Sequence, residues 1–69
     1  MNYKNITSSY EEDSLREIGN AIFVLLSQRR ELSIWSMIDI LKRSREVYGV
    51  TQNRKKAIEL AVETLSFHT

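Results

Sequence analysis

The chain has neither a disulfide nor a set of metal ligands with which to brace a small fold. Its 69 residues include no cysteine and a single histidine, His68, close to the carboxyl end. Disulfides and thiolate metal sites are therefore excluded, and a histidine metal site has one candidate ligand. A core in a chain this short rarely supplies more than about 3–5 kcal/mol. We expect the fold to rely on closely packed helices or on association with another chain, without a metal or other cofactor.

The composition favours a folded domain built from helices. Apolar residues make up 42% of the chain, which is enough for a folded core. There is no proline, and Gly19 and Gly49 are the only glycines, so few residues suit the turns of a multi-stranded sheet. Residues 1–13 are polar, unlike a signal peptide, and the longest apolar run, residues 21–26, is much shorter than a membrane span. We expect an all-α, cytoplasmic protein that makes no membrane contact.

Capping residues and apolar spacing predict where the helices begin and end. Ser9 and Glu12 fit a capping box, and Ser33 and Thr51 are placed to start two further helices. Gly49 is suited to a left-handed stop just past the end of the second helix. The predicted organisation is a flexible arm over residues 1–8 and a single helical domain over 9–69, with helices at about 9–28, 33–48 and 51–67.

Apolar residues at three- and four-residue steps predict the inward face of each helix. In the first helix they are Leu15, Ile18, Ile22 and Leu25; in the second, Ile34, Met37, Ile38 and Leu41; in the third, Ala57, Ile58, Ala61, Val62 and Leu65.

The first helix is apolar on more than one side. Residues 21–26 are all apolar, and Val24 lies about 180° from Leu15 on a helical wheel. A helix that is apolar all round must be covered all round, and two short companion helices offer limited cover. This pattern favours a homodimeric helical bundle over the alternative, a monomer with one or two exposed aliphatic residues. The predicted core and dimer-interface residues are Leu15, Ile18, Ile22, Phe23, Val24, Leu25, Leu26, Trp35, Ile38 and Leu41.

No group of residues in the sequence resembles an enzyme active site. A catalytic site needs a nucleophile with a base, paired carboxylates in a cleft, a metal or a phosphate-binding loop. His68 is better explained as a solvated terminal side chain, and Glu11, Glu12 and Asp13 as partners of a helix dipole. We expect a non-enzymatic protein with no catalytic residues.

Basic residues are concentrated in the middle of the chain. Between residues 29 and 56 there are eight Lys or Arg against three acids, a local charge of +5. The candidate residues for DNA or another anion are Arg43, Arg45, Arg54, Lys55 and Lys56. The last three fall at the start of a helix, where the dipole disfavours cations but favours a bound anion. The alternative is that these cations are simply solvated. A helix-turn-helix is disfavoured, since Arg45 and Lys55 stand where that motif usually has apolar residues.

The centre of the chain carries a distinctive series of short segments: Gly19-Asn20-Ala21-Ile22, Leu25-Leu26, Leu32-Ser33, Met37-Ile38 and Leu41. In these segments the chain resembles a family of very short enterobacterial regulators of biofilm and acid resistance, the AriR-like two-component-system connector proteins. The resemblance extends from about Glu12 to Leu65. It implies a helical homodimer that modulates the Rcs phosphorelay controlling capsule, biofilm matrix and acid-resistance genes. Some members are suspected of binding DNA non-specifically. The family has no motif of functional residues to transfer.

The resemblance therefore implies a connector that docks on a signalling protein of a two-component phosphorelay. The first alternative is a nucleoid-type regulator that binds DNA non-specifically through the basic residues, with a steep salt dependence. A further alternative is a small antitoxin or structural partner of another protein.

Overall fold

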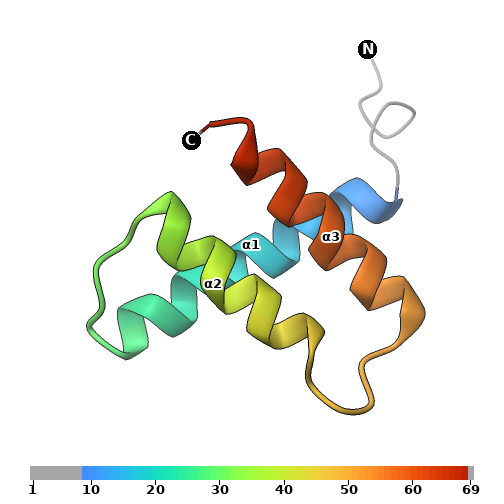
Figure 1. Cartoon of the computed structure of the whole chain (residues 1–69), viewed down its shortest axis with the longest axis horizontal. Helices are drawn as coiled ribbons and strands as arrows, with labels where there is room; N and C mark the ends of the chain where they lie inside the picture. Colours follow the sequence, from blue (N-terminus) through green and yellow to red (C-terminus); the bar gives the residue numbers. More distant parts are fainter. Residues whose placement is uncertain (1–8, 69) are drawn as a thin grey trace.

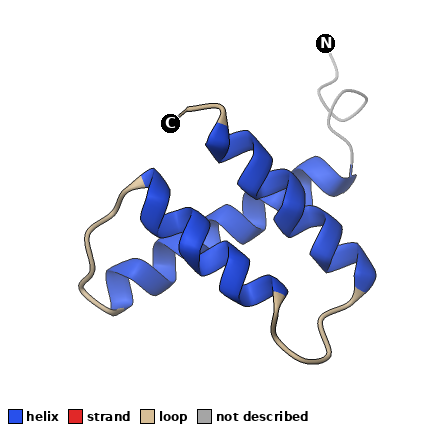
Figure 2. Cartoon of the chain, in the orientation of Figure 1, coloured by secondary structure: helices blue, strands red, loops and turns tan. Residues whose placement is uncertain are grey.

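The computed structural model describes residues 9–68, and these form three helices, which confirms the all-α prediction (Figures 1 and 2). The helices are α1 (Ser9–Ser27), α2 (Ile34–Arg45) and α3 (Gln52–Ser66). The predicted arm over residues 1–8 lies outside the described residues. None of the helices within 9–68 is long and apolar enough to cross a membrane.

Two helices begin at the capping residues that the sequence predicts. The Ser33 hydroxyl accepts a hydrogen bond from the Ser36 N–H at 3.1 Å, and the Thr51 hydroxyl accepts one from the Arg54 N–H at 3.2 Å. Each hydroxyl satisfies a backbone N–H that has no partner within its own helix. The predicted capping box at the start of α1 depends on the side chain of Ser9, which lies outside the described ones.

The prediction that the second helix extends to residue 48 was wrong. α2 ends at Arg45, and the N–H groups of Glu46 and Val47 donate to carbonyls three residues back, at 3.1 and 3.3 Å. Such short-range bonds tighten the last turn of a helix and end it. Tyr48, which would continue the apolar stripe, lies in the loop and is fully exposed. Gly49 does adopt a left-handed conformation, with φ +88°, but within this loop and not directly after the helix.

The three helices pack as one helix crossed by a pair. In Figure 1, α2 and α3 run antiparallel to each other in front of α1, and both cross it. Every helix contacts the other two. Leu25, Leu41 and Ile58, one from each helix, are the largest fully buried side chains. The core therefore lies between α1 and the pair, on one side of α1.

Candidate interaction surface

The side of α1 that faces the core differs from the predicted one. Ala21 and Leu25 are buried, and Val24, predicted to need cover from a second chain, packs against the core. Leu15, predicted to point inward, is 65% exposed. Leu15 therefore lies about a third of a turn away from the centre of the buried side of α1. The reason is that residues 21–26 are apolar in every direction, so their spacing does not select one inward side.

The opposite side of α1 carries exposed apolar residues. We define the outer face of α1 as Leu15, Gly19, Ile22, Phe23 and Leu26. Leu15, Phe23 and Leu26 are 65%, 70% and 59% exposed, while Ile22 is half-buried. A side chain at Gly19 would meet nothing within 4 Å of its Cβ. This face is a continuous apolar surface that α2 and α3 leave uncovered.

A shallow hollow adjoins the outer face near the start of α1. Its volume is about 410 Å³, and it is lined by Glu11, Ser14, Leu15, Leu60 and Thr64. The hollow runs between α1 and α3, so Leu15 stands at its edge with space beside it. An apolar side chain from another molecule can enter this hollow beside Leu15.

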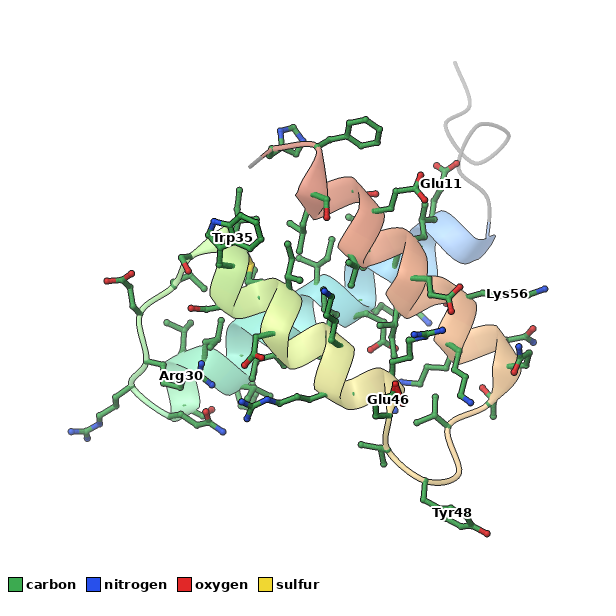
Figure 3. The ribbon with its side chains drawn as sticks, in the orientation of Figure 1. Glu11, Arg30, Trp35, Glu46, Tyr48 and Lys56 are labelled. Atoms are coloured by element: carbon green, nitrogen blue, oxygen red, sulfur yellow. The ribbon has the colours of Figure 1, made fainter. Side chains whose placement is uncertain are left out.

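A second exposed apolar position lies at the start of α2. Trp35 is 68% exposed and Leu32, just before the helix, is 49% exposed. In Figure 3, Trp35 lies at the start of α2, whereas Glu46 and Tyr48 follow the other end of this helix. Isolated exposed apolar residues are common, but tryptophan is one of the residue types enriched at the energetic centres of protein interfaces.

The ten predicted core and interface residues thus divide into two groups. Leu25, Ile38 and Leu41 are buried in the core, and Ile18 and Val24 pack against it. The remaining residues are half-buried or exposed and are available to another molecule: Leu15, Ile22, Phe23, Leu26 and Trp35.

Three of the five predicted anion-binding cations have carboxylate partners, each on a different helix. Arg43 lies 3.3 Å from Asp39 of its own helix, Arg45 lies 2.7 Å from Glu59 of α3, and Arg54 lies 2.9 Å from Glu17 of α1. These carboxylates reduce the positive potential that the three arginines would offer to a phosphate.

The two lysines at the start of α3 differ from each other in exposure. Lys55 is half-buried, whereas Lys56 is exposed and points away from the three helices in Figure 3.

The ion pair between Glu17 and Arg54 joins two helices and was not predicted. The Arg54 Nε and Nη2 groups donate to the two Glu17 carboxylate oxygens at 2.9 and 3.2 Å. The Glu17 side chain is only 10% exposed, and its hydrogen bond raises the pKa of Arg54 despite some opposing desolvation. The predicted role of Arg54 at an anion site therefore competes with a structural one. No local pattern signals this pair, because the residues lie 37 positions apart.

The Glu17–Arg54 pair forms one wall of a polar hollow of about 290 Å³. The hollow is lined by Asp13, Arg16, Glu17, Asn20, Thr51, Asn53, Arg54 and Ala57. Its two cations both lie near carboxylates, since Arg16 is 3.7 Å from Asp13. The charges of this hollow are thus balanced within it.

Within residues 9–68 there is no group of three or more His, Cys, Asp or Glu side chains that could hold a metal ion. Comparisons of the chain with protein-family models, with curated proteins and with solved structures find no match. The outer face of α1 and the exposed Trp35 are the candidate interaction surfaces.

Proposed function

We propose that this protein is a small, non-enzymatic regulator that forms a homodimer and acts by binding a signalling protein. The observation that carries the proposal is the outer face of α1, where Leu15, Phe23 and Leu26 are each more than half exposed on one helix. Grouped apolar side chains on the surface of a soluble domain mark sites where another molecule binds. Contact, and not turnover of a substrate, is the activity that such a surface supports.

A homodimer accounts for this exposed apolar surface, because the second copy covers it and removes it from water. A chain of 69 residues has a small core, and burying the outer face against a second copy adds apolar area to it. Sedimentation at micromolar concentration tests this directly. The dimer is expected to have twice the 8.1 kDa mass of the chain, and a stable monomer at that concentration contradicts it.

The proposed partner is a signalling protein of a two-component phosphorelay, which makes the chain a connector. Support for this class of partner comes from the resemblance at residues 19–22 and in the following segments, and the Rcs phosphorelay is the specific system that it implies. Trp35 supplies a second surface for such a contact, since tryptophan is enriched among the residues that dominate binding energy at protein interfaces. In this arrangement α1 holds the dimer together, and the start of α2 meets the partner.

The connector role is tested by deleting the gene in its native host and following capsule and biofilm-matrix reporters under cold, acid and biofilm growth. We expect reporter output to change on deletion and to be restored by the wild-type chain. Trp35→Ala is expected to dimerise normally but to fail to restore output, whereas Tyr48→Ala, which removes another exposed aromatic ring, restores it. Unchanged reporters after deletion contradict the connector role.

Non-specific DNA binding is the alternative, and retardation of duplex DNA tests it. The chain would then retard duplex DNA in a salt-dependent way, and replacing Lys55 and Lys56 by alanine would remove the retardation. Under the connector proposal this double variant restores reporter output as well as the wild type does. Arg54 is left unchanged in this test, because its bond to Glu17 supports the fold.

A further inference from the structure

The residue spacing on the outer face of α1 is the same in both directions along the helix. Successive residues of its central stripe, Leu15, Gly19, Ile22 and Leu26, are separated by four, three and four positions. At 100° per residue all four fall within about 60° of one another, with Phe23 on one flank. This spacing is that of a seam in a two-stranded coiled coil. Because the intervals are palindromic, a reversed copy of the helix presents the same stripe in the same order.

Reversal of the second helix gives a specific pairing. Leu15 meets Leu26 of the partner subunit, and Gly19 meets Ile22 of the partner subunit, so each contact occurs twice around a twofold axis. A twofold interface requires this kind of self-complementary patch. Two identical copies of this stripe are therefore sufficient to form the interface.

Gly19 has no role within a single chain that explains its place in α1. Glycine within a helix is less favourable than alanine by about 1 kcal/mol, as a general rule for helix interiors. A Cβ at this position would meet nothing within 4 Å, so no neighbouring residue of the same chain requires the glycine. Next to a second helix, the missing side chain leaves a recess opposite Ile22 of the partner subunit. A recess of this kind lets two helices approach closely.

The charges at the two ends of α1 favour the antiparallel arrangement. The first turn carries Glu11 and Glu12, whereas Arg29 and Arg30 follow the last turn after one intervening residue, Gln28. Glu12 and Arg29 are both exposed. In an antiparallel pair, Glu12 lies beside Arg29 of the partner subunit, at both ends of the interface. In a parallel pair, acids lie beside acids and arginines beside arginines, and the helix dipoles also repel each other.

The geometry points to a second copy of this chain as the occupant of the outer face, docked with α1 antiparallel to α1 of the partner subunit and with Leu15 opposite Leu26. This inference deepens the proposed homodimer and depends on it. It assigns the surface, the direction and the register of the pairing. The exposed Trp35 lies on α2, so this pairing leaves the proposed signalling contact to a different helix.

Engineered cysteines test the direction and the register. The chain has no cysteine of its own, so Leu15→Cys and Leu26→Cys each introduce a single thiol. Under mild oxidation, a mixture of the two variants is expected to form a disulfide-linked heterodimer. Leu26→Cys alone is expected not to cross-link within a dimer, because its two copies lie about 16 Å apart along the helix axis at 1.5 Å per residue. A disulfide needs Cα atoms less than about 7 Å apart.

The possible results separate this inference from the homodimer itself. If Leu26→Cys cross-links efficiently by itself, the helices are parallel, and the inference fails although the homodimer stands. If neither the mixture nor the single variants cross-link while sedimentation shows a dimer, the interface lies elsewhere, and the inference again fails. If sedimentation shows only monomers, the proposed homodimer fails and the inference fails with it.

A second test fills the recess at Gly19. Gly19→Leu is expected to weaken self-association at least about tenfold, since the side chain occupies the position of Ile22 from the partner subunit. Asn20→Leu is the matched control, because it adds the same side chain at the neighbouring exposed position outside the stripe. Circular dichroism is expected to show folded helices for both variants. Equal dissociation constants for Gly19→Leu and the wild type overturn the inference.

Charge exchange tests the ends of the interface. Glu12→Arg and Arg29→Glu are each expected to weaken the dimer by roughly three- to tenfold, since each places like charges together twice per dimer. The double variant is expected to restore the wild-type dissociation constant at low salt. Additive weakening in the double variant contradicts the antiparallel direction.

Discussion

The inner and outer sides of α1 differ in composition, and composition alone would predict the opposite side to be buried. The inner side buries Glu17, Ala21 and Leu25, and Ile18 and Val24 pack against the core beside them. The outer side exposes Leu15, Phe23 and Leu26, and none of the residues that define the outer face is charged. The side that holds a carboxylate is thus buried, and a side without one is left open. Fit against the neighbouring helices, and not apolar content, therefore decides which side of this helix enters the core.

Close approach of α1 and α3 explains why this side is buried. Ala21 and Ala61 are almost completely buried, and their short side chains let α1 and α3 come near each other. Because α1 and α3 lie close together, the Arg54 guanidinium donates two hydrogen bonds to the Glu17 carboxylate. A face made of Leu15, Ile22 and Leu26 would hold α3 further away and leave the carboxylate without its partner. The outer side is therefore free to serve association with another chain.

The largest contrast between the two sides is expected from neighbouring leucines. Leu25→Ala is expected to destabilise the fold by about 2–5 kcal/mol, because Leu25 is fully buried and its loss leaves a cavity. Leu26→Ala is expected to change the stability of the monomer by less than about 0.5 kcal/mol, since Leu26 is 59% exposed. Denaturant unfolding at a concentration where the chain is monomeric measures both. Equal losses would mean that the two sides are not distinguished as the structure has them.

A smaller contrast is expected between two ion pairs. Glu17→Ala is expected to cost about 1–3 kcal/mol, because it removes a hydrogen-bonded carboxylate whose side chain is only 10% exposed. Glu59→Ala is the control: its pair with Arg45 is shorter, at 2.7 Å, but the two side chains are 51% and 46% exposed. Water and salt screen such a pair, so its loss is expected to cost less than about 1 kcal/mol. The same unfolding measurement compares them. A larger effect at Glu59 would show that distance outweighs burial here.

The parts of the fold that were predicted correctly depend on neighbours in sequence. Ser33 and Thr51 act within three residues of their own positions, and the buried Ile58 and Leu65 of α3 follow a clear helical spacing. Local signals of this kind can be recognised in the sequence alone.

The parts that were missed depend on contacts between distant residues. The inward side of α1 was ambiguous, because residues 21–26 are apolar all round and only the position of α3 selects a side. The Glu17–Arg54 pair likewise exists only once α1 and α3 have packed. For the candidate site, the sequence correctly indicated that α1 carries more apolar surface than one chain covers, but it placed Val24 and not Leu15 on the open side.

The smallest effect is expected at the turn that ends α1 and leads the chain back to the inner side of this helix. Arg29 has φ +55°, while the Arg29 and Arg30 N–H groups donate to the carbonyls of Leu26 and Leu25 at 3.1 and 2.9 Å. This is the Schellman arrangement, whose left-handed position is usually glycine. A side chain there is strained, so Arg29→Gly is expected to stabilise the monomer by about 0.5–1 kcal/mol.

The gain at Arg29 is best measured where the outer face cannot associate. In a Leu26→Asp background the chain is expected to be monomeric, so loss of the Arg29 charge does not enter through the dimer. Gln28→Gly is the control, because Gln28 does not share the positive φ and gains nothing from glycine. It is expected to lose stability through the greater freedom of the unfolded chain. If both glycine variants lose stability equally, the turn at Arg29 carries no strain, and the path from α1 to the inner side is set by the packing of α2 alone.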